Sequence, residues 1–273
     1  MITAVVDGHV HIHACYDLDT FFDQAHRNLS LVASPAPGTA SEFFLLLTES
    51  AGDHYFDALR AGASGKGPLE GLRPNRWRVA TTGEDSSLVV SDGVRRLHLV
   101  AGRQVACKEG LEVLLLGTNG RFTDRRPILE VLAEGAALGL LRVIPWGAGK
   151  WFFGRARRLS ELLRTQRDAT FFLGDEGGRP GFWPYPRHFR EGAALGVRDL
   201  PGTDPLPFPH DIEKVGRVGF RKVIEFDLAA PGRSLLQALR ADPAPLERFA
   251  RLEPAVRFVR NQLAMQLRKH QSA

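Results

Sequence analysis

The chain has 273 residues, of which 44% are hydrophobic and 25% are charged, and this composition is typical of a folded globular protein with a sizeable core. Two cysteines, Cys15 and Cys107, exclude a disulfide framework and a cysteine zinc site and favour a reducing compartment. The net charge is +5 without any run of five Lys or Arg residues, so we expect no nucleic-acid partner. No stretch approaches the roughly 18 apolar residues of a membrane span, and Asp7 interrupts the apolar N-terminus. We therefore expect a cytoplasmic protein with no signal peptide and no membrane partner.

The predicted elements alternate between strands and helices along most of the chain. An apolar run through Val5 and Val6 predicts a buried first strand, and residues 17–33 form an amphipathic helix that Asp17 or Asp19 caps. Further βα units are expected in strands at 43–47, 111–117, 141–145, 170–174 and 197–202 and helices at 53–61, 127–138, 156–166 and 188–195, with a loop at 62–71. Repeated units of this kind favour a parallel sheet with right-handed crossovers, within one domain that spans residues 1–273.

Two regions depart from this alternation. Residues 76–108 contain four short alternating stretches that are separated by turn signals, which predicts an inserted antiparallel β-meander. Residues 234–270 read as C-terminal helices, at 234–240 and 245–269. The last helix carries a stripe that we expect to pack on the sheet, and a basic membrane-surface helix is the alternative; the stripe is Val256, Val259, Leu263 and Leu267.

The first strand ends in a histidine pattern that predicts a metal site. His9 and His11 lie two residues apart, and alternate residues of a strand share a face, so both imidazoles can bind one ion. Asp7 and His13 have the same parity, and Gly8 would let the backbone pass close to neighbouring elements. The alternative is a polar strand end with ordinary hydrogen bonds.

Polar residues also follow the later strands, at the edge of a parallel sheet where active sites form. Glu49 follows the second strand and Glu112 begins the strand after the meander. Lys150, Asp175 and Asp204 follow later strands, and Asp204 comes after the last. His188 and His210 lie in loops and are reserve ligands. Each residue alone could be structural, as a helix cap, a turn residue or a solvated charge.

These residues carry a resemblance to known enzymes. Asp7-Gly8-His9-Val10-His11 resembles the opening motif of the metal-dependent hydrolases, shared by the amidohydrolase superfamily and the PHP (polymerase and histidinol phosphatase) phosphoesterases. The stretches at 43–50, 109–113 and 200–205 are similar to later PHP motifs. The resemblance covers about three-quarters of the chain and implies a distorted, TIM-like (β/α) barrel of about seven parallel strands.

The chain departs from the family pattern at several ligand positions. Glu49-Ser50 stands where the family has Asp-His, and Pro205-Leu206 follows Asp204 where an Asp-x-His would be expected. Lys150 and Asp175 occupy the ends of two middle strands where amidohydrolases place histidines. A carboxylated Lys150 would bridge metals, although nothing in the sequence requires it.

The resemblance and the polar residues together predict a hydrolase that uses one or two divalent ions, zinc, manganese or iron. The expected ligands are His9, His11, Glu49, Glu112, Asp175 and Asp204, with Asp204 as general base and Lys150 as a second catalytic residue. Residues of the late loops are expected to bind a small anionic phosphoester or amide, namely Trp146, Trp151, Arg155 and Arg179. The alternative is a non-catalytic binding or scaffold descendant with a degenerate site. The oligomeric state cannot be read from the sequence.

Overall fold

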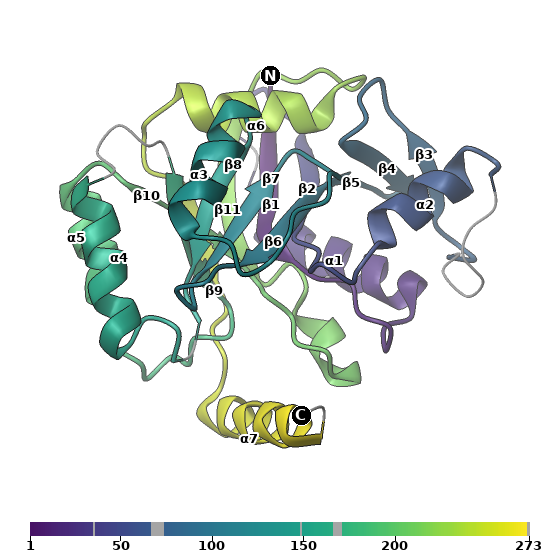
Figure 1. Ribbon diagram of the computed structural model, residues 1–273. Coiled ribbons are helices and arrows are strands. Elements are labelled where there is room, and N and C mark those ends of the chain that lie inside the picture. Colours follow the sequence, from purple (N-terminus) through teal and green to yellow (C-terminus); the bar gives the residue numbers. More distant parts are fainter. Residues whose placement is uncertain (35, 67–73, 148, 166–170, 272–273) are drawn as a thin grey trace.

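The computed structural model describes residues 1–34, 36–66, 74–147, 149–165 and 171–271, and it contains two mixed sheets with helices around them (Figure 1). The larger sheet has the strand order β12-β11-β1-β2-β5-β4-β3. Its strands are β1 (Ile2–Val10), β2 (Ser41–Leu47), β3 (Arg78–Thr81), β4 (Ser87–Ser91), β5 (Arg96–Val100), β11 (Val218–Ile224) and β12 (Glu247–Ala250). The smaller sheet has the order β10-β9-β8-β7-β6. It comprises β6 (Gly102–Ala106), β7 (Glu112–Leu116), β8 (Leu141–Pro145), β9 (Phe171–Glu176) and β10 (Arg198–Gly202).

The helices follow from amphipathic patterns and local caps. The bounds are α1 (Leu18–Val32), α2 (Tyr55–Ala63), α3 (Ile128–Ala137), α4 (Phe153–Thr165), α5 (Arg187–Ala194), α6 (Pro231–Ala241) and α7 (Ala255–Gln271), with a 3₁₀ helix at Pro209–Lys214. Asp17 caps α1, because the Thr20 backbone N–H donates to Asp17 Oδ1 at 2.8 Å. Phe21, Phe22, Ala25 and Leu29 of α1 are fully buried against the larger sheet.

The prediction of a TIM-like barrel of parallel strands is wrong. β7 pairs antiparallel with both β6 and β8, and β11 pairs antiparallel with β1. The strands instead form two sheets of seven and five strands. A strand that is buried on both faces is a continuous apolar run whichever way it points, so the runs at 111–117 and 141–145 predicted strands but not their direction.

The two sheets meet where β1 lies against β10, and glycines allow the close contact. A Cβ on Gly202 would stand 2.2 Å from the His9 backbone nitrogen, and one on Gly8 would stand 2.6 Å from the Pro201 carbonyl oxygen. The expected close approach at Gly8 is therefore confirmed. It brings the end of β1 beside the residues that follow β10.

The region expected to be a meander contributes to both sheets. β3, β4 and β5 pair antiparallel in sequence, but β5 also pairs parallel with β2, while β6 pairs with β7 in the other sheet. Of the expected elements, residues 67–71 of the loop, residue 166 of a helix and residue 170 of a strand lie outside the described residues.

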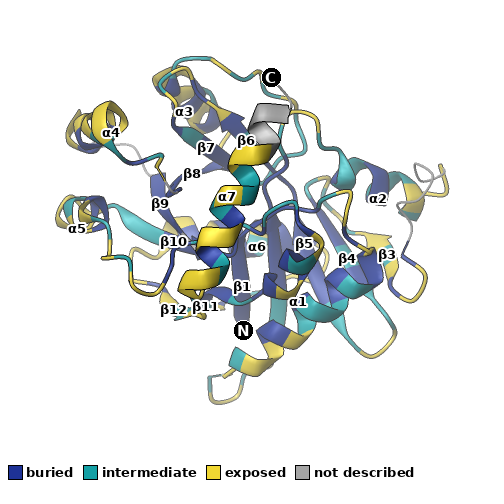
Figure 2. Cartoon of the chain, turned by 90° about the horizontal axis from the view of Figure 1, so that it is seen from below, coloured by how far each residue is buried: buried dark blue, intermediate teal, exposed yellow. Residues whose placement is uncertain are grey.

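The C-terminal region differs from expectation in two respects. Residues 245–269 do not form one helix, because β12 precedes α7. The apolar stripe of α7 does not pack on a sheet: Val256, Val259, Leu263 and Leu267 are 52–84% exposed. α7 lies below the strand ends in Figure 1, and it crosses in front of them when the molecule is seen from below in Figure 2. Among the described residues, no helix is both long and apolar enough to cross a membrane.

Candidate metal centre

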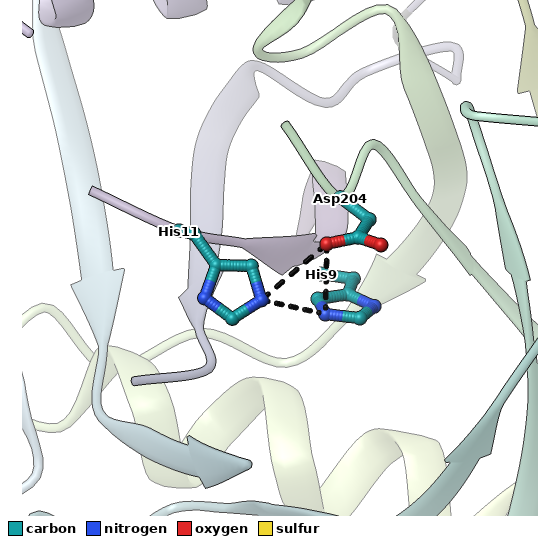
Figure 3. A group of neighbouring side chains, drawn as sticks. All are labelled: His9, His11 and Asp204. Carbon is teal, nitrogen blue, oxygen red and sulfur yellow. Dashed lines mark hydrogen bonds and ion pairs between the residues drawn. The ribbon is translucent and has the colours of Figure 1, made fainter. Parts of the chain in front are cut away.

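Three side chains from the junction of the two sheets converge on one point (Figure 3). His9 Nε2 and His11 Nε2 are 3.1 Å apart, and Asp204 Oδ1 lies 3.6 Å from the first and 3.4 Å from the second. Both histidines are buried, whereas the Asp204 side chain is 21% exposed. Within the described part of the chain, these three residues form a group of possible metal ligands whose ligand atoms all lie within 4.8 Å of one another.

The backbone around Asp204 is held in an unusual conformation. Asp204 has φ = +48°, a left-handed value that costs a non-glycine residue energy and is often found at functional sites. Its N–H donates to the His9 carbonyl oxygen at 2.8 Å, which ties the loop to β1. Asp7 holds the same loop, because the Thr203 N–H donates to Asp7 Oδ1 at 2.8 Å and the Gly216 N–H donates to Oδ2 at 2.8 Å. Asp7 therefore positions Asp204 and does not join the cluster.

The spacing of the three ligand atoms fits a divalent ion. Two ligands that bind zinc at about 2.0–2.1 Å with a tetrahedral angle between them are about 3.3 Å apart. The observed separations of 3.1, 3.4 and 3.6 Å lie around this value. Two imidazoles and one carboxylate suit zinc, manganese or iron and leave a coordination position for water or substrate. His9, His11 and Asp204 would hold the ion.

The electrostatics keep the two imidazoles in the neutral form that binds metals. Burial and, to a smaller extent, the neighbouring His9 lower the pKa of His11 to about 4, while Asp204 opposes the change. Burial also lowers the pKa of His9, with Asp204 acting in the opposite direction. Both rings are consequently neutral at physiological pH and need not release a proton when they bind an ion.

Glu112 and Lys150 lie beside this cluster as an ion pair. Lys150 Nζ is 2.5 Å from Glu112 Oε2. The negative charge of Glu112 raises the pKa of His11, and the positive charge of Lys150 lowers that of His9, so both charges act on the rings. Lys150 also lines a cavity of about 150 Å³ together with Asp204 and Trp146. The structure thus brings these predicted residues to the same place.

Glu49 lies elsewhere. Its Oε2 accepts from Arg103 Nη1 at 2.7 Å, and its Oε1 accepts from the Phe56 backbone N–H at 2.6 Å. Burial raises the pKa of Glu49 to about 7, although the bond from Phe56 and the Arg103 charge oppose this. Glu49 therefore connects the first turn of α2 to β6, which is the structural role that the sequence left open for it.

Asp175 and Arg179 form a separate ion-pair cluster with Arg248. Arg179 Nε donates to Asp175 Oδ1 at 3.1 Å and Nη2 donates to Oδ2 at 3.2 Å, while Arg248 binds Oδ2 from β12. Both Asp175 and Arg179 are buried. The structure does not bring them to the histidines.

The other predicted binding and reserve residues are dispersed. Trp151 is buried in the core and donates through Nε1 to the Pro145 carbonyl at 3.0 Å, while Arg155 is exposed and donates to the Gly149 carbonyl. His188 contacts the Ala156 carbonyl at 3.1 Å. His210 contacts Asn261 Oδ1 at 3.1 Å.

Several residues near the cluster were not predicted from the sequence. Gln104 of β6 contacts His9, with 3.2 Å between Oε1 and Nε2. Lys214 of the 3₁₀ helix and five residues of α7 line the same cavity as Asp204; those of α7 are Phe258, Asn261, Gln262, Met265 and Gln266. The sequence of α7 contains these polar residues, but its apolar stripe predicted that the opposite face of the helix would pack inward.

No protein-family model matches the chain, and no curated protein matches its sequence. The fold is similar to that of PsfC from Pseudomonas syringae PB-5123, with a TM-score of 0.60, 12% identity, and coverage of 97% of this chain and 99% of that one. It is also similar to the lesion-specific endonuclease PfuEndoQ from Pyrococcus furiosus, with a TM-score of 0.51 and 13% identity. That match covers 90% of this chain and 58% of the endonuclease. An endonuclease Q complex with a 27-mer duplex gives a TM-score of 0.49.

At 12–13% identity, these comparisons concern the fold alone. They contradict one prediction. We expected no nucleic-acid partner, but a protein of similar fold is a lesion-specific endonuclease. The prediction rested on the scattered arginines and the absence of a basic run, and a protein can bind nucleic acid without such a run.

Proposed function

We propose that this protein is a metal-dependent hydrolase of phosphoesters, with His9, His11 and Asp204 as the ligands of one divalent ion. The observation that supports this proposal most directly is the tetrahedral spacing of two neutral imidazoles and one partly exposed carboxylate. A hydrogen bond between His9 and His11 would account for their 3.1 Å separation alone. It would not account for Asp204, whose backbone has a left-handed φ and whose Oδ1 lies within 3.6 Å of both Nε2 atoms.

The residues around the ion would have different roles in the reaction. A bound ion of this kind would lower the pKa of a water and polarise the bond under attack. Asp204 has a second carboxylate oxygen, which can take a proton from an attacking water and pass it to the leaving oxygen. Lys150 places a positive charge in the same cavity, where it can stabilise negative charge that develops on the phosphoryl oxygens. Glu112 orients the Lys150 ammonium through its ion pair.

Two observations favour a phosphoester over an amide. Lys150 lines the cavity beside Asp204, and its ammonium group suits a substrate that is anionic before the reaction begins, whereas the charge of Lys214 in the same cavity is compensated by Asp211 and Glu253. The fold is also similar to that of an endonuclease, and endonucleases act on phosphodiesters. Both mononucleotide-sized and polymeric phosphoesters therefore belong in the test.

The proposal is tested by reconstituting purified protein with zinc, manganese and iron(II) in turn and measuring bound metal and hydrolysis. The substrates are an aryl phosphate monoester, an aryl phosphate diester, single- and double-stranded oligonucleotides, and an anilide amide. We expect about one equivalent of tightly bound metal and hydrolysis of at least one phosphoester. Less than about a tenth of an equivalent with every metal would contradict the proposal and favour the non-catalytic alternative.

A further inference from the structure

α7 lines the cavity beside the candidate metal centre with three amide side chains, together with Phe258 and Met265. Gln262 and Gln266 are four residues apart on one face of the helix, and both line the cavity that also contains Asp204 and Lys150. The apolar stripe of the same helix faces solvent, as the 63% exposure of Leu263 shows. Figure 2 shows this alternation of buried and exposed residues along α7 where the helix crosses the strand ends. The polar face toward the cavity is the reverse of what core packing would select.

Residues other than the two glutamines fix the position of α7. Phe258 packs against Phe182 and Trp183, with ring centroids 6.4 and 5.9 Å apart. Asn261 Nδ2 donates to the buried Asp211 Oδ1 at 3.2 Å. Just before the helix, Glu253 pairs with Lys214, which also lies 2.9 Å from Asp211 Oδ2. These contacts anchor the helix on the 3₁₀ segment and the β9–α5 loop.

The two glutamine amides have no such structural task. Among the described residues, neither side-chain amide has a hydrogen-bond partner in the protein. Each amide offers two donors and one acceptor. Trp146, which directly follows β8, lines the same cavity and adds an apolar surface. The cavity therefore combines the Asp204 carboxylate, the Lys150 ammonium group and the two glutamine amides of α7.

We propose that α7 determines the substrate specificity of the site and that Gln262 and Gln266 form hydrogen bonds with the alcohol portion of the phosphoester. This inference rests on the proposed function. It assigns the substrate to anionic esters whose alcohol portion carries hydroxyl or amide groups, such as sugar or nucleoside phosphates, in preference to esters of apolar alcohols. A polar group that is removed from water must regain its hydrogen bonds, and the two amides supply them.

The test compares two phosphomonoesters, ribose 5-phosphate and phenyl phosphate, with the metal-loaded wild type and a Gln262→Leu/Gln266→Leu variant. Leucine and glutamine have similar helix propensities, so the helix is preserved. We expect the double substitution to raise KM for ribose 5-phosphate about ten-fold or more relative to KM for phenyl phosphate, with kcat nearly unchanged. Leu263→Gln changes the polarity of the solvent side of the same helix and serves as the matched control, with no expected change in the ratio.

An unchanged ratio in a variant that still binds metal and hydrolyses either ester would overturn the role of α7 and leave the proposed function standing. Gln262→Ala and Gln266→Ala, measured singly, replace the double variant if it fails to fold. If the wild type hydrolyses neither ester, calorimetric binding of both esters to the metal-loaded protein gives the same ratio of affinities. Absence of metal binding would contradict the proposed function, and absence of preferential binding of the polar ester would contradict the inference.

Discussion

Asp175 lies near the C-terminal end of β9 and Asp204 follows the neighbouring parallel strand β10, yet the two carboxylates have opposite surroundings. Asp175 is fully buried between the guanidinium groups of Arg179 and Arg248, which compensate its charge. Asp204 is partly exposed and faces two neutral imidazoles, whose nitrogen lone pairs and its own charge suit a cation. The residues that reach a carboxylate from elsewhere in the fold thus decide whether it is available to a cation or is already compensated in a structural ion pair.

The largest expected effect is a loss of bound metal on substitution in the histidine cluster, which distinguishes that cluster from the Asp175 ion pairs. His11→Ala should reduce bound metal from about one equivalent to less than about a tenth, because the site loses one of three protein ligands. Hydrolysis should fall by more than the roughly 100-fold that loss of an outer partner of a ligand can cost. Metal analysis and circular dichroism on the same samples provide the measurement. His26→Ala on α1 is the control and should leave metal content unchanged.

Substitution in the Asp175 cluster should produce the opposite pattern. Asp175→Ala leaves the buried Arg179 without its carboxylate partner and leaves Arg248 with Asp199 alone, which should lower the free energy of unfolding by about 3–5 kcal/mol. Bound metal per folded molecule should remain near one equivalent. Urea unfolding followed by metal analysis of the folded fraction checks both expectations. A stable variant that had lost its metal would reverse the assignment of the two clusters.

The smallest expected effect is the pH dependence of stability in metal-free protein. The folded pKa of His11 is about 4, below its ordinary 6.5, so between these values the unfolded chain binds a proton that the folded protein does not. Stability contributed by the neutral ring is therefore lost as the pH falls. Between pH 7 and pH 5 we expect the wild type to lose about 2 kcal/mol more than His11→Gln, as measured by urea unfolding at each pH. Equal losses would mean that the ring is not held neutral.

The sequence predicted that His9 and His11 lie together, but it did not predict all of the residues that surround them. The two-residue spacing of His9 and His11 on a strand sufficed, because strand geometry alone puts both rings on one face. Asp204 was predicted from its place after the last strand of the βα series. Asp175 had an equivalent place, and its pairing with Arg248 depends on how β12 folds back, which no local pattern indicates.

Local sequence patterns could not predict the direction of the strands or the orientation of α7, because both depend on contacts between distant residues. Apolar strands such as β7 carry no mark of parallel or antiparallel pairing, and β11 was not predicted. The Val256–Leu267 stripe predicted that α7 would pack with its apolar side inward. The contacts of Phe258 and Asn261 place the other side inward, and these depend on residues that are distant in the chain.

Anomalous diffraction from crystals soaked in zinc or manganese tests the central claim most directly. We expect one strong anomalous peak about 2.0–2.2 Å from His9 Nε2, His11 Nε2 and a carboxylate oxygen of Asp204, because their mutual spacing already fits these bond lengths. A peak at another group of residues, or no peak after soaking with both metals, would contradict the assignment of the metal centre.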